Sequence, residues 1–350
     1  MHMKRGVPTM KSAMTRKDVA RLAGVSQPTV SLVMNNHARI SPETVLKVRG
    51  AARKLGYDPG NVNSRKGHRR RSRRPASYRK MQIALVSQIK PMLFQTPVYS
   101  KVMHGIEDEL GKLDYNLIIR NLPQEAPEKA IPRKVDGVIL FHVPAMHESR
   151  KLLGKLREIP CVQIMGGVSE NEFFDHVTYK ENQIGKMAAE HLLSKGHRTL
   201  LYFGPTRNYL RHRTFMDAVK AGGASAYQID GNFQAESREK QGPNLSAIGK
   251  AVEELKRLPV LPTAIFTPVD VIVAGLYNVL RKHGFVPGKD VEVVGVNNDR
   301  ILLDPLDPRP ASVDIHAETV GRKAVERLLW RIDNPKAPLE RLELEPEIAL

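Results

Sequence analysis

Residues 81–350 alternate between short runs rich in β-branched and aromatic residues and longer stretches in which apolar residues have helical spacing. The short runs predict strands over 82–86, 116–120, 137–141, 161–165, 199–203, 264–266 and 291–294. The longer stretches predict helices over 98–113, 147–157, 183–195, 211–221, 244–258, 270–283 and 318–332. Strands that alternate with helices form parallel sheets covered by helices. About fourteen elements exceed one such layer, so the pattern predicts two α/β lobes.

The positive charge of the chain is concentrated before this α/β region. Residues 1–80 hold 20 lysines and arginines against three acids, a net charge of +17, whereas residues 81–350 carry a net charge of +1. A cationic head on a neutral body indicates that the head meets a polyanion, and this favours nucleic acid. A solubilising or targeting tail is the alternative.

The composition of the chain indicates its domain number and its cellular compartment. Of its 350 residues 41% are hydrophobic, which is enough for the cores of two or three domains. No apolar run approaches the roughly 18 residues of a membrane span, and the first fourteen residues lack the apolar segment of a signal peptide. The single cysteine, Cys161, excludes an intramolecular disulfide and a cysteine-only metal site. We therefore expect no membrane segment and a reducing cytoplasm.

Residues 15–55 have the spacing of three short helices. Thr15 can cap the first helix, and Gly24 permits the left-handed conformation that ends it. Only three residues separate this helix from a second one over 27–34, where Pro28 is tolerated in the first turn. A third amphipathic stretch completes a small core. In a tight helix-turn-helix of this kind, the N-terminal part of the second helix enters the major groove of DNA.

One long motif resembles the DNA-binding head of the lactose/galactose-repressor (LacI/GalR) family. It runs from Thr15 to Asn35 as T-x-x-D-V-A-x-x-A-G-V-S-x-x-T-V-S-x-V-x-N, and ISPETVLKVRGAARKLGYDP follows it. Two stretches of the body, 185–205 and 262–299, resemble the second lobe of that family's effector-binding core. The resemblance covers about residues 15–347. It implies an N-terminal all-α helix-turn-helix head and an α/β periplasmic-binding-protein-like core of two Rossmann-like lobes.

The resemblance also implies domain boundaries. In the first part of the chain it predicts a disordered tail over 1–14, a helix-turn-helix DNA-binding domain over 15–59 and a basic hinge or linker over 60–80. The N-terminal lobe of the core would contain 81–178 and 313–334, and the C-terminal lobe 179–312 and 335–350. The chain would cross between the lobes near Thr178, Ser312 and Asn334.

The family match assigns DNA contacts to two sets of head residues. The base-contacting set is Gln27, Pro28 and Leu32. A glutamine can pair with adenine N6 and N7, worth roughly 1–3 kcal/mol of discrimination, whereas proline and leucine offer only apolar contact. The phosphate-contacting set, which positions the head without reading sequence, is Thr15, Ser26, Thr29, Ser31 and Asn35. Plain helix capping is an alternative or additional role for the hydroxyls.

The basic linker departs from the family pattern. The family places a short hinge helix there, and its leucine wedges into the minor groove. Lys66 stands at that position, among residues such as Gly60 and Asn61 that form helices poorly. We expect a flexible strap along the phosphates, made by Arg65, Lys66, Arg69, Arg70 and Arg71. A tether without fixed contacts is the alternative.

Three residues match effector-binding positions of the family: Arg211, Asp270 and Asn297. Each follows a predicted strand or begins a predicted helix, at the sheet edge where open α/β proteins bind ligands. A guanidinium and acid or amide acceptors suit the hydroxyls of a sugar or related metabolite. The alternatives are a helix cap for Asp270 and a surface ion pair for Arg211.

The family match also bears on assembly. Val98, Met103, Ile106 and Leu110 lie near a helix that packs against a second subunit in the family, although packing within one lobe would explain them equally well. A homodimer has independent support, because one head reads only about half a turn of groove.

These features together predict a sequence-specific DNA-binding transcriptional regulator of the LacI type, expected to repress. We expect a homodimer on a near-palindromic operator of double-stranded DNA, at the nucleoid in the cytoplasm, under the control of a small-molecule effector such as a carbohydrate. The alternative is a ligand-binding protein with only non-specific affinity for DNA. The sequence contains no H-E-x-x-H, G-x-S-x-G, Walker A or G-x-G-x-x-G motif, so it predicts no enzyme, catalytic residue, cofactor or metal site.

Overall fold

The computed structural model describes residues 15–34, 40–55, 57, 81–88, 96–113, 115–123, 125–141, 150–165, 173–207, 209–233 and 242–350. The chain divides into two units, residues 1–80 and 81–350. The predicted tail over 1–14 and the predicted linker over 60–80 lie outside the described residues. Within the described ranges, no helix is long and apolar enough to cross a membrane.

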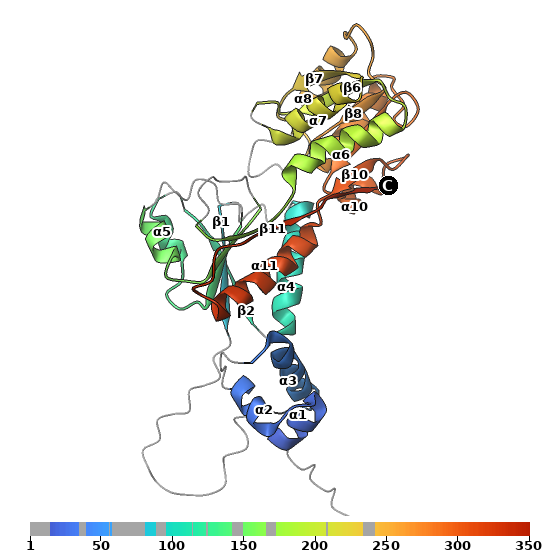
Figure 1. The fold of residues 1–350 in the computed structure, drawn as a ribbon. Coiled ribbons are helices and arrows are strands. Elements are labelled where there is room, and N and C mark those ends of the chain that lie inside the picture. Colours follow the sequence, from blue (N-terminus) through green and yellow to red (C-terminus); the bar gives the residue numbers. More distant parts are fainter. Residues whose placement is uncertain are drawn as a thin grey trace, which may run out of the picture. The chain divides into compact units, whose positions relative to one another are not determined.

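The first unit is a three-helix head (Figure 1), formed by α1 (Arg16–Ala23), α2 (Gln27–Met34) and α3 (Pro42–Leu55). Gly24 ends α1 in the left-handed region, with φ of 66°, so that α2 begins only three residues later. Each helix contributes a fully or nearly fully buried valine to the core, as Val19, Val30 and Val48 show. The predicted helix-turn-helix is therefore confirmed.

The second unit contains two lobes, each built on a six-stranded sheet. The first sheet has the order β11-β5-β4-β3-β1-β2 and is wholly parallel. Its strands are β1 (Gln82–Ser87), β2 (Asn116–Asn121), β3 (Gly137–Phe141), β4 (Cys161–Ile164), β5 (Asp175–Tyr179) and β11 (Arg341–Leu344). The two predicted α/β lobes are confirmed.

The second sheet has the order β12-β10-β9-β8-β6-β7, and only the β10–β12 pair is antiparallel. Its strands are β6 (Thr199–Gly204), β7 (Ser225–Asp230), β8 (Ala264–Phe266), β9 (Glu292–Val296), β10 (Ala311–Asp314) and β12 (Glu347–Ala349). The sequence pattern did not predict β5, β7, β10, β11 or β12.

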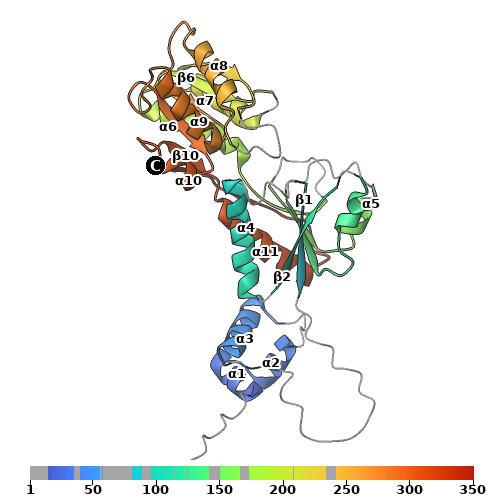
Figure 2. The same cartoon turned by 180° about the vertical axis from the view of Figure 1, so that it is seen from behind.

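Helices cover both faces of each sheet (Figures 1 and 2). On the first sheet, α4 (Pro97–Lys112) and α11 (Ala317–Asp333) lie on one face, and η3 (Pro127–Ala130) and α5 (Arg150–Leu156) on the other. Along β1, Ile83 and Leu85 join the cluster of α4 and α11, whereas Ala84 and Val86 join that of α5. Successive side chains of a strand point to opposite faces, so one strand serves both layers.

The second sheet is covered in the same way. Its helices are α6 (Glu181–Ser194), α7 (Leu210–Ala221), α8 (Leu245–Leu255), α9 (Asp270–Lys282) and the short α10 (Arg300–Leu303). Leu200 and Tyr202 of β6 pack with α6 and α7, and Leu201 and Phe203 pack with α8 and α9.

Two glycines allow α4 and α11 to cross in close contact. A Cβ atom on Gly105 would lie 2.0 Å from the carbonyl oxygen of Glu318, and one on Gly321 would lie 2.2 Å from that of Val102. Only glycine permits this backbone approach. Four apolar residues of α4 are buried in this packing: Val98, Met103, Ile106 and Leu110. Core packing, the alternative to a subunit contact, therefore accounts for them.

The chain crosses between the lobes three times, after Tyr179, after Asp314 and after Leu344. The first two crossings lie close to their predicted positions. The third does not lie near Asn334, because residues 341–344 form β11 beside β5 in the first lobe. The prediction assigned residues 335–350 to the second lobe. Of these residues only β12 joins the sheet of the second lobe, whereas β11 belongs to the sheet of the first.

The turn before β11 is held by one arginine at the end of α11. Arg331 donates to the carbonyl oxygens of Asn334, Ala337 and Pro338, at 3.1, 2.7 and 2.8 Å. These contacts direct the chain back along the first lobe, which explains the late third crossing.

The same arginine joins a buried ion network around Asp175, whose side chain is 0% exposed. The Asp175 carboxylate accepts hydrogen bonds from Arg331 Nε (2.7 Å) and Nη2 (2.9 Å), Arg327 Nη2 (3.0 Å) and the Glu340 backbone N–H (2.8 Å). Burial opposes ionisation of Asp175, but the hydrogen bonds from Arg331 and Arg327 outweigh it and hold its pKa below the usual value. This network fastens α11 to β5 and β11.

Candidate functional sites: the second head helix and the inter-lobe cavity

The N-terminal end of α2 is accessible on the head. Gln27 and Pro28 are exposed and Leu32 is half-buried, whereas Val30 and Val33 face the core. The three residues predicted to contact bases therefore belong to the accessible side of the helix that follows the tight turn.

Two of the predicted phosphate contacts also cap helices. Ser26 Oγ accepts a hydrogen bond from the Thr29 backbone N–H at 3.3 Å and lies 2.8 Å from Thr29 Oγ1. Thr15 donates to the Asp18 carboxylate from its backbone N–H and from Oγ1, at 3.0 and 2.6 Å. The hydroxyl of Thr15 holds the pKa of Asp18 below its usual value. Capping, the alternative role, is thus present in the free head.

Ser31 of α2 is half-buried. The remaining predicted DNA contacts lie outside the described residues: Asn35, Arg65, Lys66, Arg69, Arg70 and Arg71.

A cavity of about 980 Å³ lies where the carboxyl ends of both sheets meet. The strand orders β2-β1-β3-β4-β5 and β7-β6-β8-β9-β10 reverse between β1 and β3 and between β6 and β8. Open α/β sheets bind ligands at such reversals. The cavity wall accordingly includes Thr96 and Tyr99 after β1, Tyr209 after β6 and Val269 after β8.

Arg211 and Glu181 form a charged pair in this wall. Arg211 donates from Nε to Glu181 Oε1 at 2.7 Å and from Nη2 to Oε2 at 3.1 Å. It also donates to the Pro268 carbonyl oxygen and to the Tyr179 hydroxyl. Burial opposes the charge of Arg211, but the Glu181 carboxylate outweighs burial and raises the pKa of Arg211 above its usual value. The Arg211 guanidinium and the Glu181 carboxylate therefore hold each other in a fixed orientation at the cavity wall.

Aromatic side chains make much of the remaining surface. Tyr99, Tyr179 and Tyr209 all line the cavity. Burial raises the pKa of each hydroxyl, so all three stay neutral donors at physiological pH. The Oγ1 atom of Thr96 is buried and has no hydrogen-bond partner among the described residues. A buried hydroxyl without a partner is costly, and Thr96 belongs to the cavity wall.

Lys101 of α4 connects the first lobe to the loop after β9. Its Nζ donates to the carbonyl oxygens of Asn297 (3.0 Å) and Asn298 (2.6 Å) and lies 3.3 Å from Asp299 Oδ1. Asn297 and Asn298 have left-handed φ angles of 105° and 48°. Asn297 and Asp299 line the cavity, and burial raises the pKa of Asp299 to about 6.

Asp270 lies one layer behind the cavity, which differs from its predicted position in the wall. It is the first residue of α9, but the N-cap of that helix is Val269 and the Asp270 carboxyl group accepts no hydrogen bond from the α9 backbone, all of which is described, so capping does not describe its role; its side chain is fully buried. Its carboxylate accepts from the Asp299 backbone N–H at 2.8 Å and from Ser312 Oγ at 2.9 Å. Burial raises the pKa of Asp270 to about 8. The residue therefore orients the 297–299 loop, whereas Arg211 and Asn297 do line the cavity.

The sequence alone did not point to Glu181 or Lys101. Glu181 follows β5, a strand without a clear apolar signal, and Lys101 lies on a first-lobe helix far along the chain from the loop that it contacts. The one sequence feature near Glu181 that differs from its surroundings is the polar composition of residues 175–181, and it does not by itself identify a site.

Two family descriptions match the chain. Residues 15–60 match "Bacterial regulatory proteins, lacI family", and residues 189–350 match "Periplasmic binding protein-like domain". Together the two matches cover more than half of the chain. The chain belongs to the LacI family of bacterial regulatory proteins. As a LacI-family protein it is a DNA-binding transcriptional regulator with a helix-turn-helix head and a periplasmic-binding-protein-like core.

Similar proteins extend along nearly the whole LacI-family chain. The ribose operon repressor of Escherichia coli (strain K12) is 26% identical over 349 residues, which are 95% of this chain and 97% of the relative. The HTH-type transcriptional repressor PurR of Vibrio campbellii (strain ATCC BAA-1116) is 27% identical over 349 residues, 96% of this chain and 97% of the relative. Both relatives are named as repressors.

Solved structures show the same fold. A complex of the transcriptional regulator CelR with cellobiose has a TM-score of 0.64 at 23% identity, over 96% of this chain and 98% of the other. The lac repressor dimer bound to operator and the anti-inducer ONPF has a TM-score of 0.63 at 20% identity, over 97% and 98%. The LacI-family regulator of Enterococcus faecalis V583 with bound ribose has a TM-score of 0.61 at 20% identity, over 77% and 97%.

Proposed function

We propose that this LacI-family chain is a repressor that binds a near-palindromic operator as a homodimer, under the control of a sugar or related metabolite held between the lobes. One observation carries the proposal: the same chain contains two separate sites. One is the accessible second helix of the head, and the other is a large cavity where the strand order of both sheets reverses. The lac repressor dimer bound to operator and the E. coli ribose operon repressor support it. Two heads on a two-fold symmetric site supply the base contacts that one head lacks.

In the head, base reading is assigned to the accessible side of α2. Gln27 is the one member of its set with polar side-chain groups, so it pairs with a base edge, while Pro28 and Leu32 exclude water and contact a methyl group. The hydroxyls that cap helices in the free head sit at helix N-termini, where phosphate binding is favoured. The assigned phosphate set is Thr15, Ser26, Thr29, Ser31 and Asn35.

The boundaries proposed for the N-terminal part remain a head over 15–59 and a basic linker over 60–80. Charge along the linker neutralises phosphates, and each neutralised phosphate adds about −0.9 to the slope of log affinity against log salt. The residues assigned to this role are Arg65, Lys66, Arg69, Arg70 and Arg71. With Lys66 in place of an apolar wedge, operator bending is weaker than with a leucine.

The cavity has the chemistry of a sugar site. Tyrosine rings offer flat surfaces for the apolar faces of a sugar ring, and Arg211, Asn297 and the Thr96 hydroxyl offer directed hydrogen-bonding groups. Regulators of the same fold are described with bound ribose and with cellobiose. Asp270 acts behind this layer by orienting the loop that carries Asn297.

Thermal-shift measurements on the full-length protein test the effector. Ribose, cellobiose and other mono- and disaccharides are added in turn, because a ligand at 100 times its Kd stabilises the folded protein by about 2.7 kcal/mol. Thr96→Val removes a cavity hydroxyl at constant size, and we expect it to reduce the shift. Thr214→Val is the matched control, because Thr214 Oγ1 bonds to the Leu210 carbonyl oxygen within α7. A panel without any shift, or an unchanged shift in Thr96→Val, contradicts the proposed site.

Selection from a random DNA pool tests the head. The native protein is expected to recover a two-fold symmetric sequence, and Gln27→Ala to relax one position in each half-site without changing the salt dependence. If the native protein recovers no common sequence, the alternative of a ligand-binding protein with non-specific DNA affinity is correct.

We assign no catalytic activity and no cofactor to this fold, and we place the protein in the cytoplasm at the nucleoid, where its operator lies. All relatives and structures named above are described as regulators or repressors, which supports this assignment.

A further inference from the structure

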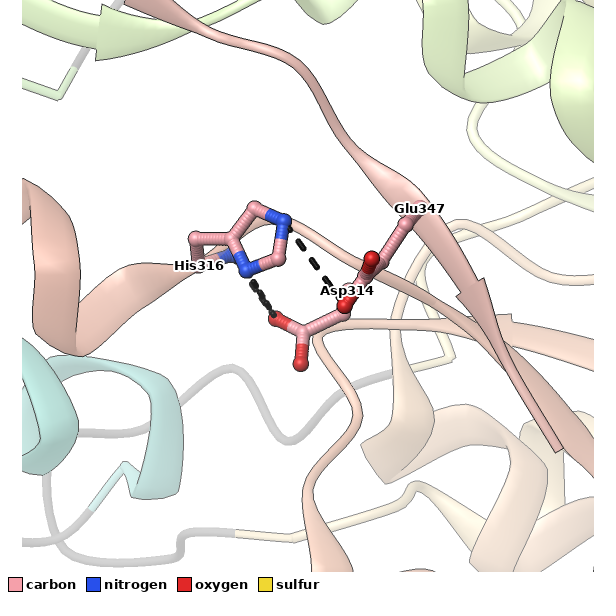
Figure 3. A group of neighbouring side chains, drawn as sticks. All are labelled: Asp314, His316 and Glu347. Atoms are coloured by element: carbon pink, nitrogen blue, oxygen red, sulfur yellow. Dashed lines mark hydrogen bonds and ion pairs between the residues drawn. The ribbon is translucent and has the colours of Figure 1, made fainter.

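Three metal-ligating side chains meet where two of the inter-lobe crossings run. Asp314 ends β10, His316 directly precedes α11, and Glu347 begins β12. One potential ligand atom from each residue lies within 4.8 Å of the other two. Figure 3 shows the imidazole ring of His316 facing both carboxylates. Its Nδ1 lies 4.0 Å from Asp314 Oδ1, and its Nε2 lies 3.9 Å from Glu347 Oε1.

The sheet register forces the two carboxylates together. Asp314 and Glu347 are directly opposite each other in the antiparallel β10–β12 pair, so their side chains lie on the same face. Like charges at directly opposite positions destabilise a strand pair. Over the described ranges, no lysine or arginine forms an ion pair with either carboxylate. The arrangement therefore lacks a fixed positive charge, and a bound cation would supply it.

A second cluster of histidine and glutamate shows the contrast. Glu292 interacts with His191 and His197, but it is also ion-paired with Lys195, which supplies the positive charge. A metal ion at Glu292 would have to displace that lysine.

We propose that Asp314, His316 and Glu347 bind a divalent transition-metal ion of the zinc class. One imidazole nitrogen and two carboxylate oxygens suit zinc and its neighbours, whereas magnesium and calcium prefer oxygen ligands alone. Ligand bonds to zinc are about 2.0–2.2 Å long, so the three side chains close inward on the ion. Glu347 is 68% exposed and has the freedom to do so.

The Asp314 carboxylate is already oriented for this role. Its Oδ1 accepts the backbone N–H of His316 at 2.7 Å, and its Oδ2 accepts Asn298 Nδ2 at 2.9 Å. Hydrogen bonds of this kind fix a ligating group in direction and strengthen metal binding. The positive N-terminal end of α11 opposes a cation, but two carboxylates outweigh its partial charge.

A bound ion would join two of the three crossings. It would link the β10–α11 connection to the start of β12, which follows the third crossing. This consequence concerns the joint between the lobes and does not depend on the identity of any effector.

Zinc titration of the chelator-treated, full-length protein tests the site by calorimetry. The chain has twelve histidines, so the informative quantity is the difference between matched variants. His316→Asn suits the left-handed backbone at this position, where φ is 54°, because asparagine tolerates that region. We expect His316→Asn and Glu347→Gln each to weaken one zinc equivalent by at least about tenfold. His197→Gln, in the cluster that Lys195 already neutralises, is expected to retain it.

Melting of the same proteins without zinc shows whether the variants fold. Zinc is expected to raise the melting temperature of the native protein and of His197→Gln, and to have a reduced effect on the other two. If His316→Asn fails to fold, Glu347→Gln at its exposed position decides the question. Unchanged zinc stoichiometry and affinity in folded Glu347→Gln would overturn the proposal.

Discussion

Replacing Asp175 with asparagine is expected to destabilise the two-lobed unit strongly. The substitution keeps the size of the side chain but removes its charge. Four hydrogen-bond donors converge on the Asp175 carboxylate, two from Arg331, one from Arg327 and one from the Glu340 backbone. An asparagine offers one acceptor oxygen, and its amide group points a further donor at the guanidinium groups.

The magnitude follows from the burial of the arginines. Arg331 is 5% exposed and would lose its only carboxylate partner among the described residues. Removing one member of a buried ion pair costs about 3–5 kcal/mol, because the remaining charge stays buried. In a unit of this size about 1 kcal/mol corresponds to about 2–4 °C in melting temperature, so we expect Asp175→Asn to lower it by about 6–20 °C.

The single tryptophan of the chain reports directly on this network. Trp330 lies 4.0 Å from the guanidinium carbon of Arg327 and 5.4 Å from that of Arg331, measured to its ring centroid. Thermal unfolding followed by tryptophan fluorescence therefore measures the affected region. Glu340→Gln is the matched control, because Glu340 pairs with Arg327 from the surface at 59% exposure and an exposed pair contributes about 0–1 kcal/mol.

The dependence on pH adds a second criterion. The folded-state pKa of Asp175 is lowered, so its contribution is present at neutral pH and is lost as the pH falls below the ordinary value of 3.8. Asp175→Asn should lack this loss. A melting temperature within about 2 °C of the native value, or an equal loss in Glu340→Gln, would refute the reasoning.

Three further predictions concern the joint and the helix pair. Lys101→Met leaves the buried Asp299 without its ion pair, and we expect a loss of about 1–3 kcal/mol above pH 6 in denaturant titrations, reduced by the partial exposure of Lys101. Asp270 has a folded pKa of about 8, so the folded chain keeps a proton that the unfolded chain releases, and this lowers stability as the pH rises from about 4 to 8; Asp270→Asn should remove the fall above about pH 6, beyond the range in which Asp299 contributes a fall of its own. Gly105→Ala forces a Cβ against α11 and should lower the melting temperature, whereas Gly111→Ala on the same helix meets open space and should stabilise by up to about 1 kcal/mol.

The elements that the sequence predicted are those with a strong apolar pattern. Strands such as β3 and β8 are buried along their whole length and read as apolar runs. The strands that were missed carry polar residues for reasons of tertiary structure. β5 begins with Asp175 and His176, which are buried by partners from distant segments, and β11 is an exposed edge strand. Local periodicity does not contain those partners.

The candidate site residues also differ in how far the sequence predicted their positions. The family motif placed Gln27 and Pro28 on the accessible side of α2, and it placed Arg211 in the cavity wall. It selected Asp270 as well, but a motif gives a position in the chain and not a layer in the fold. The layer follows from Gly295, whose missing Cβ leaves room for the Asp270 carboxylate to turn away from the cavity.

The distribution of buried polar groups explains how a cavity can control the joint. Most buried polar residues lie near the carboxyl ends of strands or in the segments that follow them: Ser87, Thr178, Arg211, Thr267, Asp270, Asn297, Asp299 and Ser312. The others, Asp175, His176 and Arg331, lie at the amino end of β5. A ligand shifts a conformational equilibrium only through contacts that differ between the two states. If the crossings between the lobes were lined by apolar residues, a hydroxyl-rich ligand would find no hydrogen-bonding partners that differ between the two states. Here the ligand's hydroxyls would meet the same loop carbonyls and carboxylates that Lys101 holds from the other lobe, so binding would change the hydrogen bonds on which the lobe arrangement depends.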